Sequence, residues 1–163
     1  MSRLGPTDAH VDVLLVCTGG GHLLQLWSLR AAWEGYEHAW VVAGDGADVA
    51  SLLQDERVIP AHFPAHRSAR NLARNFVLAV RLVRRLRPRM VMTTGAAVAV
   101  PFAWVARLRG IRVVYVESLA RAQKPSLSCR LVAPVADRVY VQWPELLEAL
   151  PRARYAGTVF TGR

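Results

Sequence analysis

The sequence predicts an α/β fold with a Rossmann-like parallel sheet and helices on both of its faces. Short apolar runs rich in β-branched residues alternate with longer stretches whose apolar side chains recur at helical spacing. The runs are apolar almost throughout, as strands are when both faces of a sheet are covered. The 163 residues, 53% of them hydrophobic, fit one domain spanning residues 1–163, in which 1–10 read as a flexible tail.

The first half of the chain predicts three strands and three helices. Residues 11–17 form an apolar run broken only by Asp12, which predicts a strand, and the helical spacing over 22–33 predicts a helix. Residues 39–43 predict a second strand, 47–54 a short helix, and 58–59 a weak third strand. Residues 60–64, which begin and end with proline, predict a loop. The longest helix is expected over 68–86, because Pro88 prevents its continuation.

The second half continues the alternation. Residues 90–93 predict a strand, and 97–108 a helix that Gly110 stops. Residues 111–116 give the clearest strand signal in the chain. A helix is expected over 126–133, a strand over 138–142, and a short helix over 144–150, with Pro144 at its first position. Residues 154–160 predict a last strand. No internal repeat, low-complexity tract or linker interrupts this pattern.

The charge and cysteine content restrict the function class. The formal net charge is +9, and Lys124 is the only lysine, so arginine carries nearly all of the positive charge. Arginine suits contacts to nucleic acid, anionic lipid or a phosphorylated small molecule, although codon usage explains part of the excess equally well. Cys17 and Cys129 are isolated in apolar stretches, which predicts buried thiols in a reducing compartment. No run approaches the roughly 20 apolar residues that span a bilayer.

Three turns are candidates for the ligand site, because open parallel sheets bind ligands beyond the carboxyl ends of their strands. The first contains Thr18, Gly19, Gly20, Gly21 and His22. Its glycines allow backbone N–H groups to approach a ligand, and the following helix N-terminus favours negative charge. The turn lacks the Lys-Ser/Thr pair of a P-loop and the third glycine of a dinucleotide fingerprint. A tight turn without a ligand remains an alternative.

His22 is the candidate general base. It lies at the N-terminal end of the first predicted helix, where the positive end of the helix dipole favours the neutral imidazole. A capping or merely exposed histidine is the alternative. His62 and His66 lie four residues apart, but Pro64 falls between them, so the spacing does not place them on one helical face and no metal site is expected.

The other two turns follow later strands. Thr94, Gly95 and Ala96 lie at a strand-to-helix junction and can offer N–H groups to a phosphate. The third turn begins with Glu117 and Ser118. Glu117 ends an apolar strand, which places its carboxylate at the ligand edge; a carboxylate that caps a neighbouring helix is the other interpretation. Arg121 follows in the same turn.

The long helix over 68–86 combines a wide apolar face with many arginines. This composition favours a helix that lies against an anionic membrane, although an ordinary amphipathic helix with a solvated basic face has the same pattern. No nucleic-acid partner is expected, because the sequence contains no recognised binding motif and no aromatic residues interleaved with the basic run.

Several motifs together resemble one family. They are Val114-Tyr-Val-Glu-Ser-Leu-Ala-Arg121, Ser126-Leu-Ser128, Val141-Gln-Trp-Pro144 and Tyr155-Ala-Gly157. The sequence resembles the acceptor-side, membrane-associated subunit of the two-part UDP-N-acetylglucosamine transferase of the dolichol pathway (asparagine-linked glycosylation 14-like). It also resembles the bacterial PssD/CpsF-type proteins of capsule and exopolysaccharide synthesis and, more distantly, the N-terminal domain of MurG. The resemblance extends over nearly the whole chain.

The resemblance implies one half of an inverting GT-B glycosyltransferase, inactive without a separate donor-binding half-subunit that holds the nucleotide sugar. The acceptor would be a polyprenyl-diphosphate-linked glycan, and the chain would be cytoplasmic and peripheral on the inner face of the plasma membrane. No metal or cofactor is implied. Carried over by position, His22 is the base and Glu117 is a second catalytic residue that lines the cleft. The two glycine turns, together with Ser118 and Arg121, would hold the acceptor diphosphate.

The sequence departs from the family in three respects, and it allows other functions. The eukaryotic relatives carry an N-terminal membrane span, which is not expected here, and Cys129 stands where relatives often have glycine. The second turn has one glycine, Gly95, where relatives often have more. A stand-alone nucleotide- or dinucleotide-binding module is one alternative, in which Asp45 would contact a ribose. A membrane-surface scaffold without catalytic residues is another.

Overall fold

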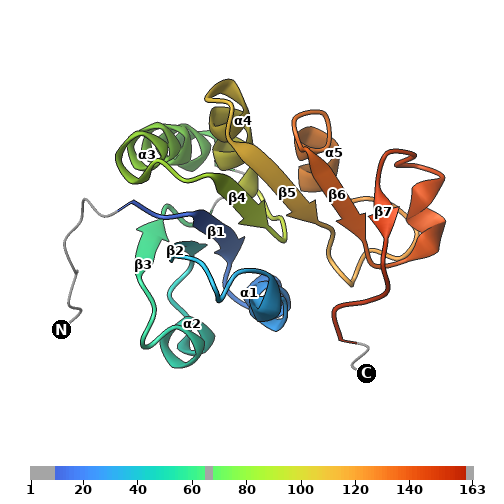
Figure 1. The fold of residues 1–163 in the computed structure, drawn as a ribbon, viewed down its shortest axis with the longest axis horizontal. Helices are drawn as coiled ribbons and strands as arrows, with labels where there is room; N and C mark the ends of the chain where they lie inside the picture. Colours follow the sequence, from blue (N-terminus) through green and yellow to red (C-terminus); the bar gives the residue numbers. More distant parts are fainter. Residues whose placement is uncertain (1–9, 65–67, 161–163) are drawn as a thin grey trace.

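The computed structural model describes residues 10–64 and 68–160. These residues form a seven-stranded parallel sheet in the order β3-β2-β1-β4-β5-β6-β7 (Figure 1). The strands are β1 (Val13–Thr18), β2 (His38–Ala43), β3 (Val58–Ala61), β4 (Met90–Thr93), β5 (Arg112–Val116), β6 (Arg138–Val141) and β7 (Arg154–Tyr155). The predicted fold class is therefore confirmed. Residues 1–9 of the tail expected over 1–10, and His66, lie outside the described residues.

Helices cover both faces of the sheet. The long α3 (Ala69–Leu86), α4 (Ala99–Leu108) and α5 (Leu127–Val132) pack on one face, and α1 (Gly21–Ser28) packs on the other. α2 (Ala47–Leu52) lies on the side of α1 (Figure 1). This division follows from the two-residue period of a strand, because alternate side chains point to opposite faces. In β1, Leu14 and Val16 pack towards α3 and α4, whereas Leu15 and Cys17 pack towards α1.

The strand order creates a switch point between β1 and β4. From β1 the chain builds outwards through β2 to β3, and α3 then carries it back to start β4 on the other side of β1. Connections to either side of such a point leave the two adjacent strands with loops that diverge, which opens a crevice at the carboxyl edge of the sheet. The loops after β1 and β4 are the first two candidate turns, so the fold brings them together.

Four elements differ from the sequence expectations. β3 includes Pro60, which was expected in a loop; β3 is an edge strand, where a residue without an N–H group is tolerated. α1 ends at Ser28 and a 3₁₀ turn, η1 (Arg30–Ala32), replaces its expected continuation. The helix expected over 144–150 is the 3₁₀ helix η2 (Pro144–Leu147), and β7 has two residues instead of seven. Both cysteines are free and buried, as predicted.

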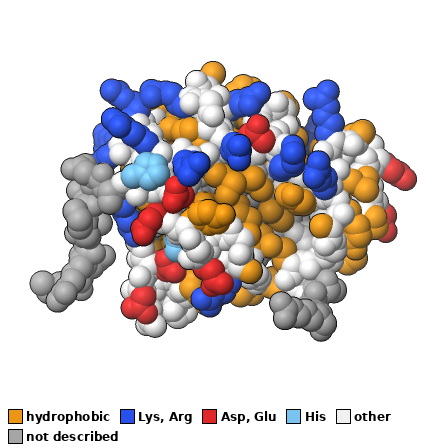
Figure 2. All heavy atoms as spheres, in the orientation of Figure 1, with side chains coloured by type: hydrophobic (Ala, Val, Ile, Leu, Met, Phe, Trp, Pro, Cys, Tyr) orange, Lys and Arg blue, Asp and Glu red, His pale blue; other side chains and the backbone are white. Residues whose placement is uncertain are grey.

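One part of the sheet face that carries α1 remains open. Within the described residues, no helix covers strands β4 to β6 on this side, and a groove of about 410 Å³ runs over them, lined by Met92, Val114, Tyr140 and residues 156–159. Figure 2 shows this face as a broad hydrophobic area with cationic side chains above it. Exposed apolar areas of this kind are typical of surfaces that another molecule covers.

Most of the excess positive charge lies far from the candidate turns. Strands β4 to β7 each begin at or directly after an arginine, namely Arg89, Arg112, Arg138 and Arg154. These positions form the edge of the sheet opposite to the carboxyl ends, and α3 and α4 end at the same edge. Cations there balance the negative ends of helix dipoles. The arginine excess is therefore not concentrated at the candidate site, where Arg121 stands.

Candidate functional site

The first glycine turn connects β1 to α1 and uses part of its hydrogen-bonding capacity inside the protein. Gly20 has a φ of 79°, a left-handed conformation that favours glycine. The Gly19 N–H donates to the carbonyl of Ala43 at 3.2 Å, and the Gly20 N–H donates to the carboxylate of Asp48. The N–H groups of the first turn of α1, from Gly21 onwards, have no intrahelical acceptor and are the donors that an anion could use.

His22 lies in this first turn of α1, and its tautomer is determined by the neighbouring loop. Its Nδ1 lies 2.8 Å from the carbonyl oxygen of Thr94. A carbonyl oxygen only accepts hydrogen bonds, so Nδ1 carries the proton and Nε2 has a free lone pair. A second hydrogen bond joins the same two residues, in which Thr94 Oγ1 donates to the carbonyl of His22 at 2.8 Å. The two candidate turns are thus joined by a reciprocal pair of hydrogen bonds.

The electrostatic environment of His22 suits a base. Burial lowers its pKa below the ordinary value of 6.5, and the charge of Arg121 lowers it further, whereas the Thr94 bond and the charge of Glu117 raise it. The net direction is downwards, so the imidazole is neutral at pH 7 and Nε2 can accept a proton. Thr94, Glu117 and Arg121, which come from the other two turns, thus all act on the protonation of His22.

The second turn has a structural requirement for glycine. Gly95 has a φ of 110°, and a Cβ at this position would lie within 2.5 Å of the Tyr115 hydroxyl. Its N–H donates to Thr93 Oγ1 at 3.0 Å, so this group is also engaged inside the protein. Ala96 adopts a φ of 64°, unusual for a residue with a side chain. The turn is thus packed directly over Tyr115.

Glu117 is completely buried and occupied by hydrogen bonds. Its carboxylate accepts from the N–H of Ser118 at 2.8 Å and from the N–H of Ser126 at 2.7 Å. The Ser126 hydroxyl lies 2.9 Å from the same carboxylate and caps α5 by accepting from the N–H of Cys129. This geometry matches the helix-capping interpretation. Direct contact between Glu117 and a substrate, which the resemblance implies, stays a prediction.

The remaining predicted residues of the third turn lie beside Glu117. Ser118 accepts from the N–H of Ala120 through its side chain and from the N–H of Arg121 through its carbonyl. Arg121 itself is exposed at the rim. Asp45, the residue considered for ribose binding, is exposed in the connection after β2.

Sequence reasoning missed three residues that shape the site. Asp48 binds the first turn, and the side chains of Gln25 and Trp143 bind the backbone of the third. Gln25 occurs as a single polar residue in the otherwise apolar run of α1, and this was the available signal. The contacts of Asp48 and Trp143 join residues 24 or more apart in sequence and leave no local pattern.

The sequence matches the family described as "Oligosaccharide biosynthesis protein Alg14 like" over residues 61–159, which is more than half of the chain. The chain belongs to this Alg14 family. Membership confirms the resemblance drawn from the motifs around Glu117 and Trp143.

Curated relatives of this Alg14-family chain carry the name UDP-N-acetylglucosamine transferase subunit ALG14. The protein of Yarrowia lipolytica is 41% identical over 89 residues, which are 51% of this chain and 41% of that protein. The protein of Eremothecium gossypii is 37% identical over 138 residues, which are 79% of this chain and 62% of that protein. The chain thus spans between two fifths and two thirds of the length of these relatives.

Solved structures share the fold of the Alg14-family chain. MurG of Acinetobacter baumannii aligns with a TM-score of 0.68 at 21% identity, over 82% of this chain and 42% of MurG. A UDP-N-acetylglucosamine 2-epimerase aligns with a TM-score of 0.74 at 13% identity, over 91% of this chain and 48% of the epimerase. These similarities establish the Rossmann-like half of a GT-B architecture.

Proposed function

We propose that the chain is the acceptor-binding, membrane-associating subunit of a split inverting GT-B glycosyltransferase. It would work with a separate donor-binding half-subunit and add a sugar to a polyprenyl-diphosphate-linked glycan in polysaccharide biosynthesis. The observation that carries this proposal is a neutral histidine with a free Nε2, held at the switch point of a single Rossmann-like domain. The relatives' name, which describes a subunit of a UDP-N-acetylglucosamine transferase, supports a second half supplied by another polypeptide.

In the proposed reaction, an acceptor hydroxyl attacks the anomeric carbon of the donor sugar. The new bond joins the acceptor oxygen to this carbon while the bond to the nucleotide diphosphate breaks, so the configuration inverts. Nε2 of His22 takes the proton of the attacking hydroxyl. The names of the ALG14 relatives support a UDP-N-acetylglucosamine donor, held by the partner.

The chain's own contribution to charge binding would come from two sources. The first-turn N–H groups of α1 and the charge of Arg121 lie at the same edge as His22 and would hold the acceptor diphosphate. Thr18 to Gly20 and Thr94 to Ala96 shape the backbone around it, although the N–H groups of Gly19, Gly20 and Gly95 already have acceptors within the protein. Ser118 would lie beside the diphosphate in the third turn.

The requirement for a partner gives the direct test of this function. We expect the purified chain alone to transfer no sugar from UDP-N-acetylglucosamine to a prenyl-diphosphate-linked acceptor. Addition of the donor-binding half-subunit should restore transfer, because the nucleotide-sugar pocket lies on that protein. Radiolabelled sugar in the lipid fraction measures the product. Turnover by the isolated chain would contradict the split, and tight calorimetric binding of NAD or NADP would favour a nucleotide-binding module instead.

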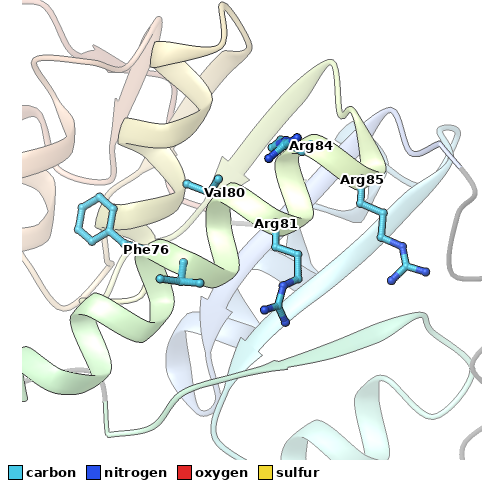
Figure 3. A pocket seen from close by; sticks show the side chains of 6 residues that line it. Phe76, Val80, Arg81, Arg84 and Arg85 are labelled. Atoms are coloured by element: carbon cyan, nitrogen blue, oxygen red, sulfur yellow. The ribbon is translucent and has the colours of Figure 1, made fainter.

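The outer surface of the α3, α4 and α5 layer is the proposed membrane contact. Phe76, Val77 and Val80 of α3 are exposed, and Val77 is 61% exposed. They line a shallow hollow of about 650 Å³ together with Arg81, Arg84 and Arg85. In Figure 3, these arginines extend from the same helix as Phe76 and Val80.

Two further properties of this layer fit an anionic bilayer surface. α4 exposes Trp104 and Leu108, and α5 exposes Leu127 and Leu131. None of the three helices contains an acidic residue. Apolar side chains that enter the head-group region, flanked by arginines that bind lipid phosphates, are the chemistry of a peripheral membrane protein. We therefore propose that the chain is peripheral on the inner face of the plasma membrane. Among the described residues, no helix combines the length and apolar character needed to cross a bilayer.

Removal of two arginines should weaken vesicle binding. Each arginine near an anionic surface contributes about 1 kcal/mol, so the double variant Arg81→Gln and Arg84→Gln is expected to bind phosphatidylglycerol vesicles roughly 30-fold more weakly. Co-sedimentation at fixed ionic strength measures the partition coefficient. The matched control is Arg152→Gln with Arg154→Gln, which removes the same charge from exposed positions outside the α3 to α5 layer. Equal losses in both variants would mean that net charge alone drives binding.

A further inference from the structure

The loop that follows β5 is held by side chains from two other elements. The N–H of Leu119 donates to Oε1 of Gln25 at 3.1 Å, and its carbonyl accepts from Nε1 of Trp143 at 2.7 Å. Nε2 of Gln25 also donates to the carbonyl of Glu117 at 2.8 Å. Three side-chain bonds thus bind a stretch of three residues. Such a stretch would otherwise depend on water for its hydrogen bonds.

Gln25 is suited to this task by its position and its chemistry. It is only 2% exposed, and a buried amide is costly unless its groups are bonded. Its two bonds use both ends of the amide, with nitrogen towards a carbonyl and oxygen towards an N–H, and only this orientation satisfies both partners. Leucine could make neither bond. Glutamate could accept from Leu119 but would direct a negative charge at the carbonyl of Glu117.

The bonds of Gln25 connect parts of the sheet that do not touch through strand pairing. β4 lies between β1 and β5, so α1 and the third turn are separated by a full strand. Gln25 is three residues after His22 and therefore projects from a neighbouring position on the same side of α1. The Arg121 N–H bonds to the Ser118 carbonyl, so Arg121 closes the turn that Gln25 holds. Helix α1 thus carries His22, the proposed base, and also fixes the loop that contains Arg121.

We infer that Gln25 is a positioning residue. It holds Arg121 at a fixed place relative to His22, so that both residues contact the same diphosphate-bearing acceptor. Trp143 supports the same loop from the side of β6. The inference rests on the proposed function, because it names the residue that arranges the proposed diphosphate contact. The contact between Gln25 and the loop is, however, measurable without any substrate.

Hydrogen exchange of the intact chain tests the holding of the loop. In Gln25→Leu, the amides of residues 118–121 should exchange at least tenfold faster, because the acceptor of the Leu119 N–H is lost, while the amides of α3 keep their rates. Gln25→Glu should show an intermediate increase, since it keeps one of the two bonds. Ser28→Ala is the control, because Ser28 bonds only within α1. Unchanged exchange over 118–121, or an equal increase throughout the chain, would overturn the inference.

A double-mutant cycle tests the positioning of Arg121, with inorganic pyrophosphate as the probe in calorimetric titrations. In the natural background, Arg121→Gln should lower the affinity about tenfold, since one charge-assisted contact is lost. In the Gln25→Leu background the same change should cost less than threefold, because Arg121 is already displaced. Equal losses in both backgrounds would reject the positioning role. If the natural chain binds no pyrophosphate, the diphosphate site of the proposed function fails, and the exchange rates still decide whether Gln25 holds the loop.

Discussion

Replacement of His22 by glutamine is expected to lower the kcat of sugar transfer by about 100- to 10,000-fold, measured on the complex of this chain with the donor-binding half-subunit. This range is typical for removal of a general base, because glutamine cannot accept the proton of the attacking hydroxyl. Association with the donor-binding partner should persist, since the glutamine side chain can still donate to the Thr94 carbonyl that His22 now contacts. Steady-state kinetics with saturating donor measures kcat, and analytical ultracentrifugation measures association.

A second histidine provides the control for this variant. His38 bonds to the carbonyl of Tyr36 and to the carboxylate of Glu56, at the edge of the sheet opposite to the candidate site. His38→Gln should therefore leave kcat within about twofold of the natural value. A near-normal kcat for the His22 variant would remove His22 as the base.

The pH dependence of the reaction distinguishes a base from a residue that only binds. The pKa of His22 is lowered below 6.5, so the rate should rise with pH below this value and reach a plateau near neutrality. Arg121 contributes to the lowering, because a nearby positive charge disfavours the imidazolium. Arg121→Gln should therefore raise the pKa of His22 and move the acidic limb of the profile to higher pH. An unchanged limb would mean that His22 and Arg121 are not coupled during the reaction.

Replacement of Glu117 by alanine should destabilise the fold by about 2–4 kcal/mol, because each donor left without an acceptor in the protein costs about 1–3 kcal/mol. The variant would leave the partly buried N–H groups of Ser118 and Ser126 without their acceptor. It would also remove the carboxylate that contacts the hydroxyl capping α5. Urea denaturation followed by circular dichroism gives the free energy of unfolding.

Two comparisons separate a structural from a catalytic role of Glu117. Glu117→Gln retains one acceptor oxygen and should lose about half as much stability. Glu145→Gln removes an exposed carboxylate from η2 and should change the stability by less than about 0.5 kcal/mol. If Glu117→Gln is as stable as the natural chain but strongly impaired in transfer, the carboxylate acts on substrate and its capping contacts are dispensable.

The sequence predicted the fold well because each strand carries its own signal. Apolar runs such as 111–116 and stop residues such as Gly110 and Pro88 act locally, and they place most elements within two residues of their observed bounds. The errors lie where tertiary context decides. Pro60 joins β3 because this strand is at an edge, and β7 is short because it pairs only with the last two residues of β6.

The candidate site was less accessible to sequence reasoning. The glycine turns were identifiable, since glycine before a helix indicates a special backbone. No local sequence pattern, however, shows that Asp48 accepts a hydrogen bond from the Gly20 N–H. Nor does one show that glycine is required at position 95 because the Tyr115 hydroxyl lies against it. The role of Gln25 depends on a loop more than ninety residues away. Such contacts follow from the strand order, which no single segment encodes.

The reciprocal bonds between His22 and Thr94 make the tautomer of His22, and with it the proposed role as a base, depend on the conformation of two loops. The imidazole ring presents Nε2 as a base only while the two loops stay together. A movement that separates them would free the ring to rotate and its proton to move to the other nitrogen. One such hydrogen bond contributes about 1 kcal/mol, so the locked ring is favoured only severalfold over released states. If His22 is the base of the proposed reaction, substrate or partner binding that holds the two loops together would therefore favour the reactive tautomer.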